Sequence, residues 1–328
     1  MIPIIRAAAA VVAAGAVVLS PQMALAQQGQ PFPSRPARII VPFPPGQAAD
    51  IFARLAADRL TATWGQTVLV ENRAGGAGVI GAEAAARAKP DGYTVLMGSA
   101  GPISINPHVF AKLPYDVQKD FVPLAQIVSL PLVIVAHPSL PVRSVKELIA
   151  LARARPGEVQ FASAGLATSQ HLAGELFTSM AGVKMVHVPY KGSGAALQDL
   201  LGGHVTLMFD SLTSALPSIQ SGKLRALGVT TRERVPAAKD IPAIGEQLAG
   251  YEAVGWIGAL GIAGTPSELV ARWTADLAAI VKEPATRERI LAQASVPGAL
   301  SGAEFGAFLR QQNDLWGKVV RTSGTRLD

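Results

Sequence analysis

The sequence predicts an α/β protein built from two lobes, with a cleft between them. Short β-like runs alternate with helical patterns along most of the chain, which is typical of a parallel sheet with crossover helices. Several of these runs are followed by loops rich in glycine, alanine and hydroxyl residues. After an N-terminal export signal about 300 residues remain, enough for two domains of ordinary size, each with its own core.

The N-terminal segment has the three parts of a secretory signal peptide: Arg6, an apolar stretch at residues 7–19, and the tripeptide Ala-Leu-Ala at residues 24–26. We expect cleavage there, so that residues 1–26 are removed. A membrane anchor is the alternative, but the apolar stretch is shorter than the roughly 20 residues that a bilayer requires. The chain has no cysteine. A lipid anchor on cysteine is therefore excluded, and the exported protein should be soluble.

The formal net charge is +6, and removal of Arg6 with the signal peptide would leave +5. Such an excess could steer anionic ligands toward the protein, or it could simply keep the protein soluble. The lysines and arginines are scattered and aromatic residues are few, so the sequence lacks the footprint of a nucleic-acid-binding protein.

In the first part of the chain, β-like runs alternate with two helical patterns. A helix is expected over residues 49–60, where Ile51, Phe52 and Leu55 recur at helical spacing, and Gly65 ends the segment. The strands are expected at residues 38–43, 68–71 and 93–97.

The rest of the chain supplies a second series of elements. A capping box formed by Ser144 and Glu147 predicts a helix start, and Thr265 and Ser301 are the predicted capping hydroxyls of two later helices. Strands are expected at residues 132–136, 159–162, 185–188, 205–209 and 224–229. The amphipathic tail predicts core contacts for Phe305, Phe308, Leu309 and Trp316.

Residues 76–81 match the G-x-G-x-x-G pattern of dinucleotide-binding loops, after a strand and at the start of a helix. A Rossmann site also needs an acidic residue at the end of the next strand, where this chain has Leu-Met-Gly-Ser at residues 96–99. No cofactor is therefore expected, although these glycines could shape a wall of the cleft. A nucleotide-binding enzyme is kept as an alternative.

Other catalytic patterns are missing from the sequence. There is no G-x-S-x-G elbow, and Ser99 and Ser163 lie in loops without a partner evident from sequence. The five histidines lack metal-binding spacing, and cysteine ligands are absent. We expect neither catalysis nor a metal site.

Three loops of small residues follow predicted strands, at residues 44–50, 98–101 and 163–169. In open α/β sheets, ligands bind at the carboxyl ends of strands, where helix N-termini present unpaired N–H groups and partial positive charge. These loops therefore favour a carboxylate ligand. Thr168 and Ser169 could contact it, cap the helix, or both. Asp50 could be structural or could orient a ligand, and Ser99 is a further candidate contact.

Seven motifs in this chain resemble the Bug family of periplasmic solute receptors, the binding proteins of tripartite tricarboxylate transporters. They are VPFPPGQAADI at residues 41–51, VENRAGGAGVIGAE at 70–83, KPDGYTVLMG at 89–98, LPYDVQKDFVPLAQI at 113–127, HLAGELF at 171–177, VHVPYKGSGAALQDLLGG at 186–203 and LMFDS at 207–211. Together they cover essentially the whole mature chain.

The resemblance implies a two-lobed periplasmic binding protein of type II-like architecture, with the ligand in a cleft between the lobes. Lobe 1 would comprise residues 27–129 and 252–328, and lobe 2 residues 130–251, with hinges near residues 128–132 and 251–256. Carried over by position, the implied ligand contacts are Phe43, Pro45, Gly46, Gln47 and Ala48 with Asp50 in support, then Ala164, Gly165, Thr168, Ser169, His171 and the cleft residue Asp210.

The implied function is capture of a monocarboxylate, dicarboxylate or amino acid, without catalysis, for delivery to the membrane subunits of a tripartite tricarboxylate transporter. Delivery to a signalling ectodomain is an alternative, as is a ligand-independent interaction protein. Two departures from the family pattern bear on specificity: Gln47 replaces a usual glycine, and the apolar Leu166 replaces a smaller or polar residue.

Overall fold

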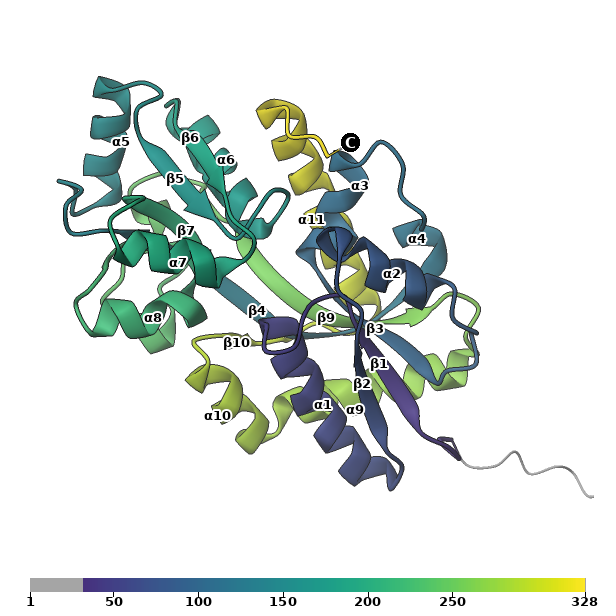
Figure 1. Cartoon of the computed structure of the whole chain (residues 1–328). Helices are drawn as coiled ribbons and strands as arrows, with labels where there is room; N and C mark the ends of the chain where they lie inside the picture. Colours follow the sequence, from purple (N-terminus) through teal and green to yellow (C-terminus); the bar gives the residue numbers. More distant parts are fainter. Residues whose placement is uncertain (1–31, 328) are drawn as a thin grey trace, which may run out of the picture. The chain divides into compact units, whose positions relative to one another are not determined.

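The structure is a computed structural model that describes residues 32–327. The predicted signal peptide, residues 1–26, lies outside the described residues. The strands of the described chain form one ten-stranded sheet with the order β2-β1-β3-β9-β4-β7-β5-β6, and β8 and β10 also pair with β4 (Figure 1). The predicted α/β class is confirmed.

The first group of strands is parallel, and β1 and β3 are largely buried. It contains β1 (Ala37–Val41), β2 (Val68–Asn72) and β3 (Thr94–Ser99), with β1 in the middle. Helix α1 (Ala48–Trp64) connects β1 to β2, and α2 (Val79–Ala86) connects β2 to β3. As predicted, Gly65 ends α1, in the left-handed conformation that glycine adopts most readily. Of the helix's apolar residues, Phe52 and Leu55 are buried, whereas Ile51 is exposed.

Two antiparallel strands join this group to the second one. They are β4 (Phe121–Ala136) and β9 (Val254–Ile262). β9 lies between β3 and β4, and β4 pairs with β9 as far as Pro131. From Leu132 onward β4 pairs instead with β7 and β8. A single strand thus belongs to both groups, and the sequence predicted only its last five residues.

The second group covers its strands with helices of its own (Figure 1). Its strands are β5 (Gln160–Ser163), β6 (Val186–Pro189), β7 (Leu207–Ser211) and β8 (Arg225–Val229). Its helices are α5 (Val145–Ala154), α6 (Ser169–Ala181), α7 (Ser193–Leu201) and α8 (Leu212–Gln220). β6, β5 and β7 run parallel to one another, and β7 is antiparallel to β4.

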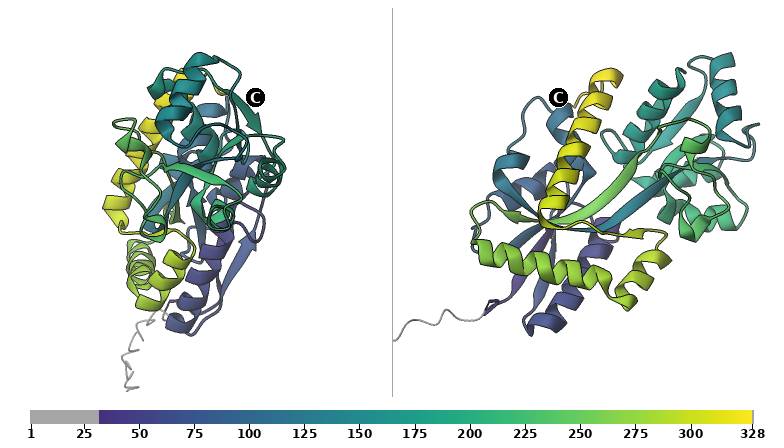
Figure 2. Two further views of the ribbon diagram at one scale, coloured as in Figure 1. Left: turned by 90° about the vertical axis from the view of Figure 1, so that its left-hand side faces the viewer. Right: turned by 180° about the vertical axis from the view of Figure 1, so that it is seen from behind.

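The C-terminal part of the chain returns to the first group (Figure 2). It comprises α9 (Ser267–Lys282), α10 (Pro284–Ala292), β10 (Val296–Pro297) and α11 (Gly302–Ser323). α9 packs against α1 and β4, and α11 packs against β4 and α6. The short helices α3 (Asn106–Val109) and α4 (Val117–Asp120) lie between β3 and β4.

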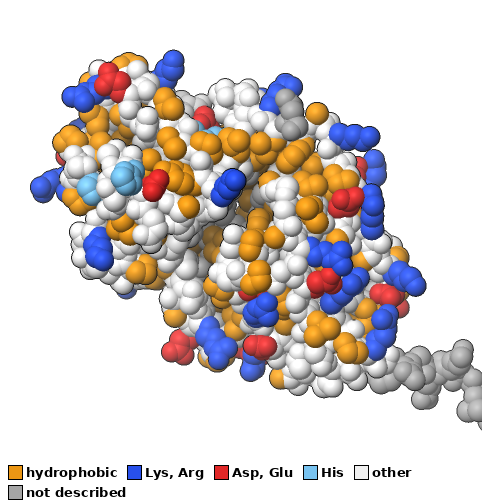
Figure 3. Space-filling model, in the orientation of Figure 1, with side chains coloured by type: hydrophobic (Ala, Val, Ile, Leu, Met, Phe, Trp, Pro, Cys, Tyr) orange, Lys and Arg blue, Asp and Glu red, His pale blue; other side chains and the backbone are white. Residues whose placement is uncertain are grey.

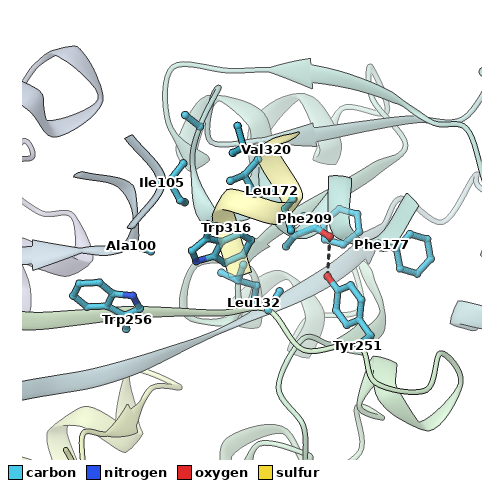
Figure 4. Packing of buried hydrophobic residues seen from close by; sticks show 14 of the residues in the cluster. Ala100, Ile105, Leu132, Leu172, Phe177, Phe209, Tyr251, Trp256, Trp316 and Val320 are labelled. Carbon is cyan, nitrogen blue, oxygen red and sulfur yellow. Dashed lines mark hydrogen bonds between the residues drawn. The ribbon is translucent and has the colours of Figure 1, made fainter. Parts of the chain in front are cut away.

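The hydrophobic core continues from one strand group into the other (Figure 4). Phe177 packs against Phe209 and Tyr251, with ring centroids 5.8 and 6.1 Å apart. The buried Tyr251 hydroxyl donates to the carbonyl of Ala173 at 2.8 Å. Of the predicted tail contacts, Phe305, Leu309 and Trp316 are buried and Phe308 is half-buried.

Three predicted helix starts differ in detail from the structure. Ser144 caps α5 by accepting from the Glu147 N–H at 3.1 Å, but the Glu147 carboxylate accepts from the Arg143 N–H, one residue earlier than a capping box requires. Within residues 32–327 the buried Thr265 hydroxyl has no partner, and α9 begins two residues later, at Ser267. Ser301 precedes α11 but makes no side-chain cap bond. Both predictions of a capping hydroxyl at these two positions were therefore wrong.

Candidate ligand-binding site

The loops predicted to bind ligand lie at two edges of the sheet. β1, β2 and β3 are parallel, so the loops that follow them meet at one edge of the first group. β5, β6 and β7 are also parallel, which gathers the loops after them at one edge of the second group. A hollow is visible near the centre of the face drawn in Figure 3, where these two sets of loops approach each other.

The loop after β1 is held by a buried carboxylate. Asp50, only 3% exposed, accepts from the Gly46 N–H at 2.9 Å, from the Asn72 amide at 2.9 Å and from Arg54, whose closest nitrogen is 2.9 Å away. The Asn72 amide also donates to the Phe43 carbonyl at 3.0 Å. Burial alone would raise the pKa of Asp50, but the bonds from Arg54, Gly46 and Asn72 outweigh it and lower that pKa. Asp50 therefore stays ionised and fixes the shape of this loop.

The same loop leads into an uncapped helix N-terminus. Gln47 is the N-cap residue of α1, but its side chain makes no cap bond. The first N–H bonded within the helix is that of Ile51, which donates to the Gln47 carbonyl at 3.0 Å. In residues 32–327 the N–H groups of Ala48, Ala49 and Asp50 have no hydrogen-bond partner. They form a set of donors at the positive end of the helix dipole.

The loop after β5 is held by neutral side chains. Thr168 caps α6: its hydroxyl accepts from the His171 N–H at 3.2 Å and donates to the Gly165 carbonyl at 2.7 Å. Gly165 has a φ of 137°, and a Cβ there would lie 2.7 Å from the Tyr190 carbonyl oxygen, so only glycine fits. The Ser169 hydroxyl donates to the Gln170 side chain at 3.2 Å and leaves the capping to Thr168.

His171 and Asp210 lie behind the loops of the second group. His171 is 3% exposed, and its Nδ1 accepts from the Ala167 N–H at 3.2 Å. Asp210, at the end of β7, is fully buried and accepts from the hydroxyls of Ser193 at 2.6 Å and Ser214 at 3.0 Å. Burial raises the pKa of Asp210 to about 6. In this conformation both side chains support the loops from beneath.

The remaining predicted residues lie on the loop surfaces. Pro45, Gly46 and Gln47 are exposed, and Phe43, Ala48, Ser99 and Ala164 are partly exposed. Leu166 is 44% exposed, so its apolar side chain lies on the surface of the loop.

Sequence reasoning missed two polar partners. Ser163 does have a partner: its hydroxyl oxygen lies 2.7 Å from Nε2 of His187 on β6. Asn72, which bridges Asp50 and Phe43, was also missed. The pairing of β5 with β6 brings Ser163 and His187 together, and this register was not evident from the residue pattern. Asn72 ends β2, next to the end of β1, which is the signal that could have marked it.

The glycine motif forms a tight loop at the start of α2. Gly75, Gly76, Ala77 and Gly78 all have positive φ, and the Asn106 amide donates to the Ala77 carbonyl at 3.0 Å. α2 begins directly after Gly78, as predicted.

Other features of the described chain lie elsewhere. A pocket of about 900 Å³ between α3, α4 and α11 contains none of the predicted ligand-binding residues. Across residues 32–327 no group of acidic and histidine side chains is placed to hold a metal ion. Within the same range, every helix is too short or too polar to cross a bilayer.

The two-lobed sheet and the loops at its facing edges define the class of periplasmic binding proteins. Within that class, the chain belongs to the tripartite tricarboxylate transporter family receptors, whose family pattern matches residues 52–325. The resemblance to Bug proteins is confirmed by BugT of Bordetella pertussis, which is 36% identical over 90% of this chain and 91% of BugT.

Solved structures agree with this class and family. An R. palustris protein solved with adipate is 35% identical, with a TM-score of 0.83 over 90% of this chain and 100% of that protein. The periplasmic binding protein BugD is 33% identical, with a TM-score of 0.78 over 90% of this chain and 99% of BugD. MatC of Rhodopseudomonas palustris, solved with malate, is 28% identical, with a TM-score of 0.77 over 88% of this chain and 100% of MatC.

Proposed function

We propose that this chain is an exported, soluble periplasmic receptor that captures a small carboxylate for a tripartite tricarboxylate-type transporter, without catalysis. One observation carries the proposal: two helices, α1 and α6, begin at facing loops of small residues and present unpartnered N–H groups there. In the described residues the N–H groups of Ala48, Ala49 and Asp50 at the start of α1 have no hydrogen-bond partner. Within residues 32–327 the same is true of the N–H groups of Ser169 and Gln170 at the start of α6.

Helix N-termini are suited to a carboxylate because their N–H groups and the helix dipole both favour negative charge. Loop residues 43–48 and 164–169 include no lysine or arginine. Asp50, the acidic group nearest the first loop, is already paired with Arg54, so it presents little uncompensated negative charge to a ligand. Two such helix ends can hold the two ends of a dicarboxylate, or the carboxylate and a polar end of a smaller acid.

We assign lobe 1 to residues 27–129 and 252–328 and lobe 2 to residues 130–251. The change of partner in β4 after Pro131 and the start of β9 at Val254 support these boundaries. A hinge at these two crossings would let the lobes close on a ligand as rigid bodies.

Ligand chemistry is supported by relatives and by one side chain. The similar R. palustris protein was solved with adipate and MatC with malate, both small dicarboxylates. The exposed Leu166 lies among the proposed ligand-binding residues of lobe 2, where its apolar side chain favours a ligand with an aliphatic chain. We therefore expect adipate to bind more tightly than the hydroxylated malate.

The leader and the family support a periplasmic location and transporter partners. The signal-peptide pattern at residues 1–26 supports export, and the similar BugD is a periplasmic binding protein. Membrane subunits of the transporter are the proposed partners. A sensor ectodomain is the second candidate.

The Ser163–His187 pair does not favour hydrolysis. Ser163 is fully buried, so a substrate carbonyl has no access to its hydroxyl. Burial and the neighbouring His171 lower the pKa of His187 to about 3, which makes its imidazole a poor general base at neutral pH.

Titration with a panel of carboxylates, read by calorimetry and thermal unfolding, tests this function, because a ligand that binds only the native state raises Tm. Two variants test whether the N–H groups at the starts of α1 and α6 bind the ligand. Ala48→Pro and Ser169→Pro each remove one N–H at the first position of a helix, where proline is tolerated. Each should weaken adipate binding by roughly 10- to 100-fold, the scale of a hydrogen bond to a charged group.

Ser267→Pro provides the matched control, because Ser267 holds the same first position in α9, away from the loops. It should leave affinity unchanged. A wild-type protein that binds no carboxylate in the panel would contradict the proposed function, and equal losses in all three proline variants would contradict the assignment of the grip.

A further inference from the structure

The hydroxyl of Ser163 has three contacts but only one proton. Its oxygen lies 2.7 Å from His187 Nε2, 3.1 Å from the Gly165 nitrogen and 3.1 Å from the Gly165 carbonyl oxygen. The Gly165 carbonyl can only accept a hydrogen bond, so the Ser163 hydroxyl donates to it, and the Gly165 N–H donates to the hydroxyl oxygen. All three contacts are satisfied only if His187 also donates, which places the imidazole proton on Nε2.

A second imidazole stacks on the first. The rings of His171 and His187 lie 3.8 Å apart with an angle of 17° between their planes, and Phe161 lies 5.0 Å from His187. His171 Nδ1 accepts from the Ala167 N–H, so its own proton is on Nε2, which lies 3.5 Å from Glu175. Two neutral imidazoles in the same tautomer therefore hold the loop from below.

These bonds decide which backbone groups of the loop are free. Ser163, Thr168 and His171 use the N–H of Gly165, its carbonyl and the N–H of Ala167. In the described chain the N–H groups of Leu166, Ser169 and Gln170 are left without partners. Ala167 has a φ of 56°, a costly conformation for a residue with a side chain, so the surrounding bonds must maintain it.

We propose that His187 and Ser163 are positioning residues of the carboxylate site: the His187 Nε2–H fixes the Ser163 hydroxyl, which fixes Gly165 and so aims the free N–H groups of the loop. Neither side chain touches the ligand. This inference rests on the proposed function for its binding consequence, but not for its effect on the loop itself.

Two substitutions at position 187 separate the hydrogen bond from the packing. His187→Phe keeps a ring against Phe161 and His171 but removes the Nε2–H, whereas His187→Gln keeps an N–H donor near the same place. His187→Phe should weaken adipate binding at least 10-fold, and His187→Gln should recover affinity to within about threefold of wild type. His204→Gln, at an exposed histidine of the same strand group, is the control and should change nothing.

Hydrogen exchange of the unliganded protein gives a readout that needs no ligand. In His187→Phe the hydrogen-bonded amides of Gly165, Ala167 and His171 should exchange faster, while the rest of α6 and β5 keep their protection. Unchanged exchange of these amides would overturn the inference, as would equal loss of affinity in the Phe and Gln variants. If the wild type bound no carboxylate, the proposed function would fail while the exchange comparison still tested the positioning of the loop.

Discussion

The loop after β1 is held by charged groups, whereas the loop after β5 is held by neutral ones. In the first, an ionised carboxylate receives bonds from a guanidinium, an amide and a backbone N–H. In the second, the side-chain support comes from two imidazoles and two hydroxyls. Charge-assisted hydrogen bonds are individually stronger, but those at Asp50 require that the carboxylate stay ionised, whereas the second loop depends on the neutral imidazole of His187. The two halves of the proposed site should therefore respond differently to substitution and to pH.

Removal of the charged support should have the largest effect. Asp50→Ala leaves the amide of Asn72 and the N–H of Gly46 without their buried acceptor, and we expect a loss of roughly 2–3 kcal/mol in the free energy of unfolding. Adipate affinity should fall by at least 30-fold as the loop loses its shape. Urea unfolding measures the change in stability, and calorimetry measures the change in affinity. An Asp50→Ala protein with wild-type stability would contradict this prediction.

The neutral support should make the second loop sensitive to acid. The pKa of His187 is lowered to about 3 in the native protein, against 6.5 for a free imidazole. Between these values the unfolded chain binds a proton that the native state does not, so this group lowers stability as the pH falls from 6.5 toward 3. Urea unfolding at pH 7, 5 and 4 should show that His187→Gln removes this loss. Parallel pH curves for variant and wild type would contradict the prediction.

Asp210 should act in the opposite direction. Its pKa is raised to about 6 in the native state from the ordinary value of 3.8, so between these values the native protein holds a proton that the unfolded chain has released. This group therefore adds stability as the pH falls from 6 to 3.8. Asp210→Asn should lose stability on acidification more steeply than wild type, because the stabilising contribution of Asp210 is then absent. The same unfolding series checks this, and a shallower curve would exclude it.

Backbone strain at Ala167 should give the smallest change. Its φ of 56° is easier for glycine to adopt, so Ala167→Gly should alter the free energy of unfolding by less than about 1 kcal/mol, with a gain if strain outweighs the added chain entropy. Ala294, with a φ of 50° outside the loops, is the control position. Adipate affinity should not change with Ala294→Gly, and the Tm of each variant measures the balance between strain relief and added chain entropy. A change of more than about 1 kcal/mol in Ala167→Gly would contradict the prediction.

Much of the fold could be predicted from residue patterns, and the exceptions have physical causes. The first part of β4 was missed because Pro123 and Pro131, which cannot donate to a sheet, lie within it. β9 was missed because it contains Gly255, Gly258 and Gly261. A Cβ at Gly258 would lie 2.4 Å from the ring of Phe305, so tertiary packing selects glycine against strand propensity.

The sequence predicted where the loops of the candidate site lie, but not which side chains hold them. Small residues after strands marked both loops correctly as segments at the sheet edges, since chain order and strand direction fix that placement. The supports Asn72 and His187 come from neighbouring strands, so their contacts with the loops depend on sheet register. Register is a long-range property that a single sequence seldom reveals.

The place of β9 between β3 and β4 affects how the chain can fold. β3 and β4 cannot be joined in the sheet until residues 254–262 have been made, long after β3 at residues 94–99. Contacts so distant in sequence slow folding, because a long loop must close before they form. For a chain that must cross a membrane unfolded, as the proposed export requires, this delay keeps the emerging polypeptide competent for translocation.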